Sequence, residues 1–268
     1  MKRGYLRVLL FLTAFVLLTA SLPACSPAES PAAEEVVEEI ELDADISEPE
    51  AEETEPTPKD AFIEDIISLG KELFDKANGK YQRAHYKGDI YVCKNFTVYL
   101  FRQTRGKYRM AEYPDTELKI PNNLPEKQCR PYAYGYCWEE IPASGGNPFY
   151  EAAQFLYDSK LSKEENIALA EEFMKQTRKG DYFQMTGDYS GGKGAHSAIF
   201  MSDYDPESNT VRSLESNRSG KRINGLRYGK VEYDCELDIS VWIGFFCRKK
   251  CGATLYRLRD DIIIADRQ

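Results

Sequence analysis

Histidine and tryptophan are the scarcest residues in this 268-residue sequence, with two of each. His85 and His196 are therefore the only candidates for an imidazole base. The sequence has no apolar run long enough to cross a bilayer, because its one extended run, 8–20, falls short of the roughly 20 residues that a spanning helix needs. A basic stripe with interleaved aromatic residues is also missing, which argues against nucleic acid as a partner.

The first 25 residues predict export. Three basic residues precede the apolar run 8–20, and this pattern is typical of a secretory signal peptide. The following residues, Leu22-Pro23-Ala24-Cys25, resemble the bacterial lipobox. That resemblance implies a signal peptide over 1–24 and a lipid on Cys25, so we expect an extracytoplasmic lipoprotein anchored to the membrane by its acyl chains. The alternative is an ordinary cysteine after an ordinary signal.

An acidic segment follows. Residues 26–60 contain fourteen Asp or Glu, one Lys, five Pro and no aromatic residue, so they cannot bury enough apolar surface to offset the entropy of ordering. We interpret 25–60 as the lipidated cysteine and a disordered tether that reaches roughly 100 Å at ~3.1 Å per residue. A run of this charge could instead bind a basic partner.

The remaining residues, 61–268, suit one folded domain. The net charge of the chain is −9. Residues 1–25 carry +3 and 26–60 carry −13, which leaves only +1 for 61–268. The domain is therefore nearly neutral, although the chain as a whole is acidic.

Three helices are predicted near the start of this domain and in its middle. Apolar residues at helical spacing predict the first over 61–78, and a second begins near Cys93 and ends at Gly106. The sequence Ser162-Lys163-Glu164-Glu165 matches a capping box, which predicts a third helix that ends before Gly180.

Residues 107–160 are rich in Tyr, Pro and Gly and show no sustained period, so we interpret them as a long insertion. After residue 180 the period changes to two. Strands are predicted at 181–185, 195–201, 211–214, 225–233, 239–246 and 254–258. Helices followed by clustered strands predict an α+β fold with N-terminal helices packed on a mostly antiparallel, barrel-like sheet.

Besides Cys25, the sequence has six cysteines: Cys93, Cys129, Cys137, Cys235, Cys247 and Cys251. Six could form three disulfides, with fifteen possible connectivities. If Cys93 is a free nucleophile, five remain and one of those is unpaired. A zinc site from Cys247, Cys251, Cys129 and Cys137 has loose spacing and no nearby histidine, so we predict no metal.

His196 is the better candidate of the two histidines. His85 lies in a polar stretch, whereas His196 follows the glycine-rich residues 191–194 and opens an apolar strand, beside a flexible loop. If this strand pairs with the next as a hairpin, the residue numbers of opposite positions add up to about 411–413. His196 then faces Glu215 or Asn217. The alternative is that both are turn-forming residues.

Cys93 is suited to act as a nucleophile, because the N–H groups and the positive dipole end of a helix stabilise a thiolate. The same N–H groups can form an oxyanion hole. A thiol, an imidazole and a polar residue that fixes the tautomer of the imidazole make a catalytic relay.

Four short segments together resemble the NlpC/P60 and CHAP superfamily of papain-like peptidoglycan hydrolases. They are Val92-Cys93-Lys94-Asn95-Phe96, Gly180-Asp181-Tyr182-Phe183, His196-Ser197-Ala198-Ile199-Phe200 and Leu214-Glu215-Ser216-Asn217. The resemblance covers roughly 80–260, interrupted by 107–160. NlpC/P60 members usually carry Asp-Cys-Ser-Gly-Phe, whereas Val92, Lys94 and Asn95 stand here in place of Asp, Ser and Gly.

The resemblance implies a papain-like fold with Cys93 as nucleophile, His196 as general base and then acid, and Glu215 or Asn217 orienting the imidazole. A tyrosine upstream of the nucleophile often assists the oxyanion hole in that family, and Tyr81, Tyr86 and Tyr91 are candidates for this role.

The implied activity is that of a cysteine peptidase or amidase that cuts amide bonds in peptidoglycan stem peptides or cross-bridges. It needs no cofactor, and we expect a monomer. Two alternatives remain: a non-catalytic module of the same fold that binds cell wall or protein, and an acyltransferase or deamidase with the same triad.

Overall fold

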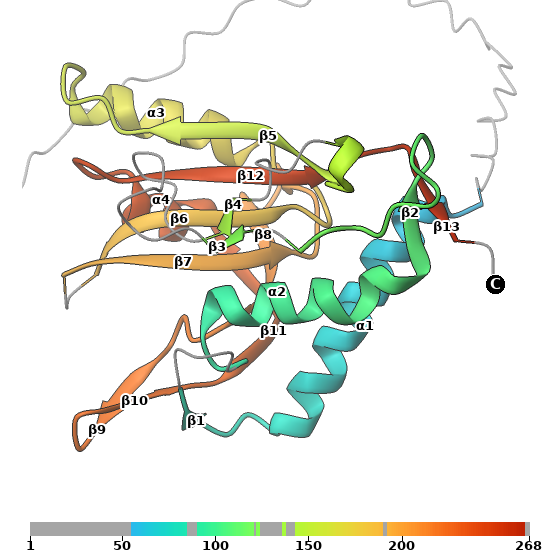
Figure 1. Cartoon of the computed structure of the whole chain (residues 1–268). Helices are drawn as coiled ribbons and strands as arrows, with labels where there is room; N and C mark the ends of the chain where they lie inside the picture. The colour runs from blue at the N-terminus through green and yellow to red at the C-terminus, as the bar shows by residue number, and fades with distance from the viewer. Residues whose placement is uncertain are drawn as a thin grey trace, which may run out of the picture. The chain divides into compact units, whose positions relative to one another are not determined.

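The structure of the folded part is a computed structural model that describes residues 55–84, 90–120, 122–123, 136–137, 143–189 and 192–265 (Figure 1). All of them belong to the unit Glu53–Gln268. The predicted signal peptide 1–24, the predicted lipidation site Cys25 and the predicted tether up to residue 54 lie outside the described residues. The predicted end of the tether at residue 60 is wrong, because residues 58–60 form the first turn of a helix. Within the ranges given, no helix has the length and apolar character to cross a membrane.

The described residues form four α-helices: α1 (Pro58–Ala77), α2 (Cys93–Thr104), α3 (Lys163–Met174) and α4 (Ile239–Phe246). The predicted capping box of α3 is confirmed, because the Ser162 hydroxyl accepts from the Glu165 N–H while the Glu165 carboxylate accepts from the Ser162 N–H. Helix α2 begins at Cys93, as the sequence predicts.

The main sheet has six strands: β5 (Phe149–Leu156), β6 (Tyr182–Tyr189), β7 (Gly192–Phe200), β8 (Thr210–Ser216), β11 (Val231–Asp238) and β12 (Gly252–Leu258). Their order is β11-β8-β7-β6-β12-β5, and every neighbouring pair is antiparallel. The predicted α+β class with a mostly antiparallel sheet is confirmed. The predicted barrel-like closure is wrong, because β11 and β5 are two separate edges of an open sheet.

Smaller sheets complete the fold. One has the order β1-β10-β9, formed by β1 (Gln82–Arg83), β10 (Leu226–Gly229) and β9 (Lys221–Ile223). Two more are the pairs β2 (Tyr108–Met110) with β13 (Ile262–Ile264) and β3 (Asn122–Asn123) with β4 (Tyr136–Cys137). Short 3-10 helices cover Arg105–Lys107 and Ala143–Gly145.

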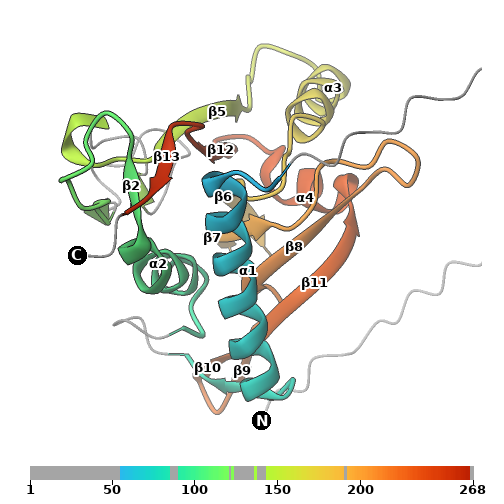
Figure 2. The ribbon, with the colours of Figure 1, turned by 90° about the vertical axis from the view of Figure 1, so that its right-hand side faces the viewer.

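Side chains alternate between two hydrophobic cores along the strands. On β7, Ile199 belongs to the core that contains the apolar faces of α1 and α2, whereas Phe200 belongs to the core that contains those of α3 and α4. Helix α1 crosses β8 and β11 (Figure 2). At this crossing a Cβ added to Gly70 would lie 2.3 Å from Cδ2 of Leu214, so the close approach requires glycine.

Two predictions about elements fail. Residues 239–246, predicted as a strand, form α4, because a short apolar run alone does not distinguish a strand from a buried helix and Asp238 caps the Ser240 N–H. The predicted insertion 107–160 contains β5, which pairs along its length with β12 and is therefore part of the main sheet.

The three-disulfide alternative is also wrong, since the thiols of Cys93, Cys235 and Cys247 are all free. Cys129 lies outside the described residues. The described part of the chain holds no group of three or more His, Cys, Asp or Glu side chains placed to bind a metal ion.

Candidate active site

Cys93 is the first residue of α2, which packs against β7 and β8. Its side chain is only 8% exposed, and Sγ lies 3.9 Å from the carbonyl oxygen of Ala195. The preceding Val92 has an extended backbone and no side-chain oxygen to cap the helix. The first intrahelical hydrogen bond is Phe96 N–H to the Val92 carbonyl, so the N–H groups of the first three residues precede the helical ladder.

His196 and Glu215 form the core of the site. Nε2 of His196 lies 2.5 Å from Oε2 of Glu215, and the two side chains are 5% and 0% exposed. Strand register explains the pairing. Ala198 is opposite Glu215, and their residue numbers add up to 413, the upper end of the range predicted for paired positions. Residues 196 and 198 share one strand face, so Glu215 is the diagonal neighbour of His196.

The imidazole also interacts with the thiol of Cys93, and this interaction acts on the pKa of both groups. Because Nε2 faces Glu215, the ring nitrogen that remains for the sulfur is Nδ1. On another side the ring stacks on Trp242 of α4, with centroids 6.1 Å apart and an interplanar angle of 29°. A carboxylate, a thiol and an indole thus fix the orientation of His196.

The second carboxylate oxygen of Glu215 is also engaged. Oε1 accepts hydrogen bonds from the Ser213 hydroxyl and from Nε of Arg218, both at 2.8 Å. Arg218 in turn reaches Oε1 of Glu232 at 3.4 Å, and Glu232 accepts from the backbone N–H and the hydroxyl of Ser219. The buried carboxylate therefore faces a cation on either side, the imidazolium at one oxygen and the guanidinium at the other.

The pKa values of the three groups move in the directions that an ion pair requires. Burial alone raises the pKa of the Cys93 thiol, but the hydrogen bond and charge of His196 and the N–H groups of Ser197 and Lys94 outweigh it and lower that pKa. Burial lowers the pKa of His196, yet hydrogen bonds and charges of Cys93 and Glu215 raise it to about 10.

For Glu215 burial acts to raise the pKa, and the opposing effects of His196, Arg218 and Ser213 leave it below its ordinary value. These directions favour a thiolate, an imidazolium and a carboxylate together in the site.

Asn217, the alternative partner for the imidazole, is a turn residue. Its φ is +68°, its N–H donates to the Lys230 carbonyl, and its Oδ1 has no hydrogen-bond partner within the described ranges. A Cβ on Gly220 would lie 2.1 Å from that Oδ1, so the amide fills the inside of the turn. Of the two candidates, the structure brings only Glu215 to His196.

Two of the candidate tyrosines lie within the described residues. The Tyr81 hydroxyl donates to the Ser219 carbonyl at 3.0 Å, which places it in the turn beyond Glu215. Tyr91 precedes the N-cap residue of α2. His85 and Tyr86 lie outside the described residues.

Sequence reasoning missed Ser213, Arg218, Glu232 and Trp242. Ser213 could have been found, because it lies two residues from Glu215 on the same strand face. Arg218 and Glu232 meet only after the chain returns along β11, a contact without a local signal. Trp242 was missed because its helix was predicted as a strand.

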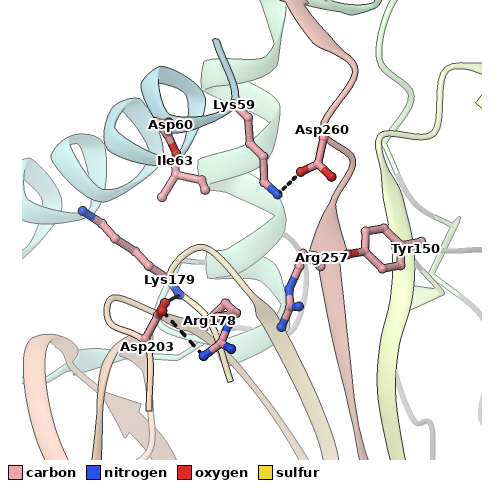
Figure 3. Close-up of a pocket in the computed structure, with 9 residues that line it drawn as sticks. All are labelled: Lys59, Asp60, Ile63, Tyr150, Arg178, Lys179, Asp203, Arg257 and Asp260. Atoms are coloured by element: carbon pink, nitrogen blue, oxygen red, sulfur yellow. Dashed lines mark hydrogen bonds and ion pairs between the residues drawn. The ribbon is translucent and has the colours of Figure 1, made fainter. Parts of the chain in front are cut away.

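A separate pocket of about 380 Å³ lies between the start of α1 and the loops around β6 and β12 (Figure 3). Its charged residues are mostly paired, with Lys59 2.7 Å from Asp260 and Arg178 3.6 Å from Asp203. None of its lining residues belongs to the cluster around Cys93.

Comparison with known proteins gives no relative: no protein-family model matches the chain, and no curated protein and no solved structure matches it significantly. The functional conclusion therefore depends on the geometry of the site and on the sequence motifs.

Proposed function

We propose that the protein is a cysteine hydrolase with a papain-like catalytic domain that cuts amide bonds. The observation that carries the proposal is a buried cluster in which His196 interacts with Cys93 on one side and with Glu215 on the other. A buried ion pair costs desolvation energy, so it is a poor means of stabilising a core. A thiolate held against an imidazolium is, in contrast, what nucleophilic attack requires.

In the first step Sγ of Cys93 attacks the carbonyl carbon of the scissile amide. The C–S bond forms, and the carbonyl electron pair moves to oxygen, where N–H groups at the start of α2 can stabilise it. His196 then gives its Nδ1 proton to the amide nitrogen as the C–N bond breaks, and an amine leaves. Glu215 stabilises the imidazolium and fixes its tautomer through Nε2.

In the second step water hydrolyses the thioester. Neutral His196 takes a proton from water, the new C–O bond forms, and the C–S bond breaks. The products are a carboxylic acid and the original thiolate–imidazolium pair. No cofactor takes part in either step.

We extend the proposal to the substrate and the location. The segments around Cys93, His196 and Glu215 resemble NlpC/P60 and CHAP hydrolases, which supports peptidoglycan stem peptides or cross-bridges as substrates. The lipobox-like residues before Cys25 support a membrane-anchored, extracytoplasmic lipoprotein. An acidic tether that reaches roughly 100 Å would let an anchored catalyst act on the wall around it.

The test uses the full chain, its Cys93→Ser and His196→Ala variants, and Cys247→Ser as the matched thiol control. Each is incubated with purified wall fragments, and mass spectrometry follows the release of cleaved stem peptides. We expect release by the wild type and by Cys247→Ser only. In parallel, iodoacetamide should label Cys93 rapidly in the wild type. Labelling should be at least tenfold slower in His196→Ala, because this variant lacks the positioned acid–base group.

A wild type that neither reacts at Cys93 nor releases fragments would disprove the proposal. Wall binding without thiol reactivity would identify a binding module. Products carrying a new acyl acceptor would identify an acyltransferase.

A further inference from the structure

The β9–β10 hairpin is continuous with the strand that carries Glu215. The chain leaves β8 after Ser216, forms the hairpin over 221–229, and returns as β11, where Glu232 pairs with Glu215. Asn224 and Gly225 at its tip both have positive φ, the geometry of a two-residue hairpin turn. Figures 1 and 2 show the hairpin projecting at one end of the folded part.

The base of this hairpin lies beside the start of α2. A Cβ added to Gly229 would lie 2.6 Å from the Tyr91 carbonyl oxygen, so the strand packs tightly against the residue two positions before Cys93. On the other side, Gly220 packs against Asn217. The hairpin therefore begins next to the thiol and extends away from it.

Positive charge is concentrated on this hairpin. Residues 221–229 contain Lys221, Arg222 and Arg227 but no Asp or Glu, although 61–268 as a whole carries only +1. The flanking Arg218 and Lys230 pair with Glu215 and Glu232. Arg222 lies directly opposite Arg227 in the strand register. Like charges at directly opposite positions disfavour a strand pair, and an anion beside Arg222 would relieve this repulsion.

The outer strand β9 is an open edge. In the order β1-β10-β9 it has no described strand on its far side, and Lys221, Arg222 and Ile223 are all exposed. Lys221 is held in place, since its Nζ lies 3.8 Å from the centroid of the Tyr81 ring. The backbone groups of such an edge can pair with an extended peptide.

We propose that the edge of β9 binds an extended acidic peptide and directs it towards Cys93. Its backbone pairs with β9, and its carboxylates lie against Lys221 and Arg222. The three residues of β9, at ~3.3 Å each, span about 10 Å. Lys221 and Arg222 therefore contact side chains of the peptide that lie a few residues from the bond to be cut. This inference rests on the proposed function, because it makes the bound peptide the substrate.

Binding is measured on the full chain carrying Cys93→Ser, so that the measurement does not depend on the reactivity of the thiol. Fluorescence anisotropy compares a labelled hexapeptide rich in Glu with its Gln analogue. We expect the Glu peptide to bind roughly tenfold more tightly at low salt, since each of two partly exposed charge pairs contributes up to about 1 kcal/mol. Arg222→Gln should reduce this preference, and Arg222→Glu should abolish it.

The matched control is Lys160→Glu, a charge reversal at an exposed residue before α3, which should keep the preference. Arg222→Glu should also unfold at a slightly higher temperature, because an oppositely charged residue then faces Arg227. A cooperative unfolding transition verifies that the variant folds. A Glu peptide with N-methylated backbone should bind more weakly if the backbone pairs with β9.

Equal affinity for the Glu and Gln peptides, or an unchanged preference in Arg222→Glu, would overturn the inference. So would polyphosphate that binds as tightly as the Glu peptide, since it cannot pair with a strand. Wall cleavage without any acidic preference would disprove only this inference. An acidic preference without cleavage by the wild type would disprove only the proposed function.

Discussion

At the scale of single residues, the catalytic potential of Cys93 depends on a carboxylate that it does not touch. Glu215 holds the imidazolium through Nε2, and the imidazolium in turn stabilises the thiolate. Replacement of Glu215 by Gln removes the charge and keeps the shape. We expect the pKa of His196 to fall and the pKa of Cys93 to rise. The pH at which acid suppresses the reactivity of the thiol should therefore increase by roughly 1–3 pH units.

The measurement is the rate of iodoacetamide labelling at Cys93 against pH. The wild-type rate should fall as acid protonates the thiolate, at a lower pH than for an ordinary thiol because the pKa of Cys93 is lowered. In Glu215→Gln that fall should occur at higher pH. Glu232→Gln is the control, because the hydrogen-bond link from Glu232 to Glu215 runs through Arg218, so this variant should shift the profile less. An identical profile for Glu215→Gln and wild type would contradict this account.

At the scale of elements, the crossing of α1 over β8 permits a paired test of packing. Gly70→Ala places a methyl group 2.3 Å from Cδ2 of Leu214, the neighbour of Glu215, so overpacking should cost about 1–3 kcal/mol of unfolding free energy. Gly244→Ala in α4 meets no atom within 4 Å and should stabilise by up to about 1 kcal/mol, through helix propensity. Urea denaturation compares the two variants, and equal effects would refute the close crossing.

A second element-scale prediction concerns the junction of α3, β6 and β12. Asp181 is fully buried, accepts two hydrogen bonds from the Arg257 guanidinium at 2.7 and 2.8 Å, and accepts a third from the Arg178 N–H. Asp181→Ala leaves Arg257 without this partner and should cost about 3–5 kcal/mol.

Asp203→Ala is the matched control for this junction. It breaks an exposed pair with Arg178 at 3.6 Å and an exposed hydrogen bond from the Lys179 N–H at 2.9 Å, and should cost about 1–2 kcal/mol. Both free energies come from urea denaturation. A loss of similar size in the two variants would show that the buried junction carries no special share of the stability.

Local signals in the sequence account for the elements that it predicts correctly. The capping box at Ser162, the two-residue period of β6, β7 and β8, and the hairpin register that leads from His196 to Glu215 are all local or near-local. The failures are non-local. Strand β5 pairs with β12, which lies about a hundred residues later in the sequence. Whether the sheet is open or closed depends on which strands pair, and a two-residue period does not encode that choice.

At the scale of the whole molecule, the proposal joins a folded hydrolase to a lipid anchor. Cys25→Ser removes the only residue that could carry the lipid in the lipobox-like sequence. We therefore expect the wild type to partition into the detergent phase of a cell lysate and Cys25→Ser to partition into the aqueous phase or the medium. Cys247→Ser, a thiol change within the folded part, should partition like the wild type. Detergent partitioning of Cys25→Ser would contradict the anchor.

The valine before Cys93 has a consequence for evolution and engineering. A serine or aspartate at that position would commonly add about 1 kcal/mol of helix stability by taking N–H groups of the first turn. Here the N–H of Lys94 turns towards the sulfur instead. A polar residue at position 92, such as the Asp usual in NlpC/P60 members, would compete with the sulfur for this N–H, so one side chain links the stability of α2 to the electrostatics of the thiol.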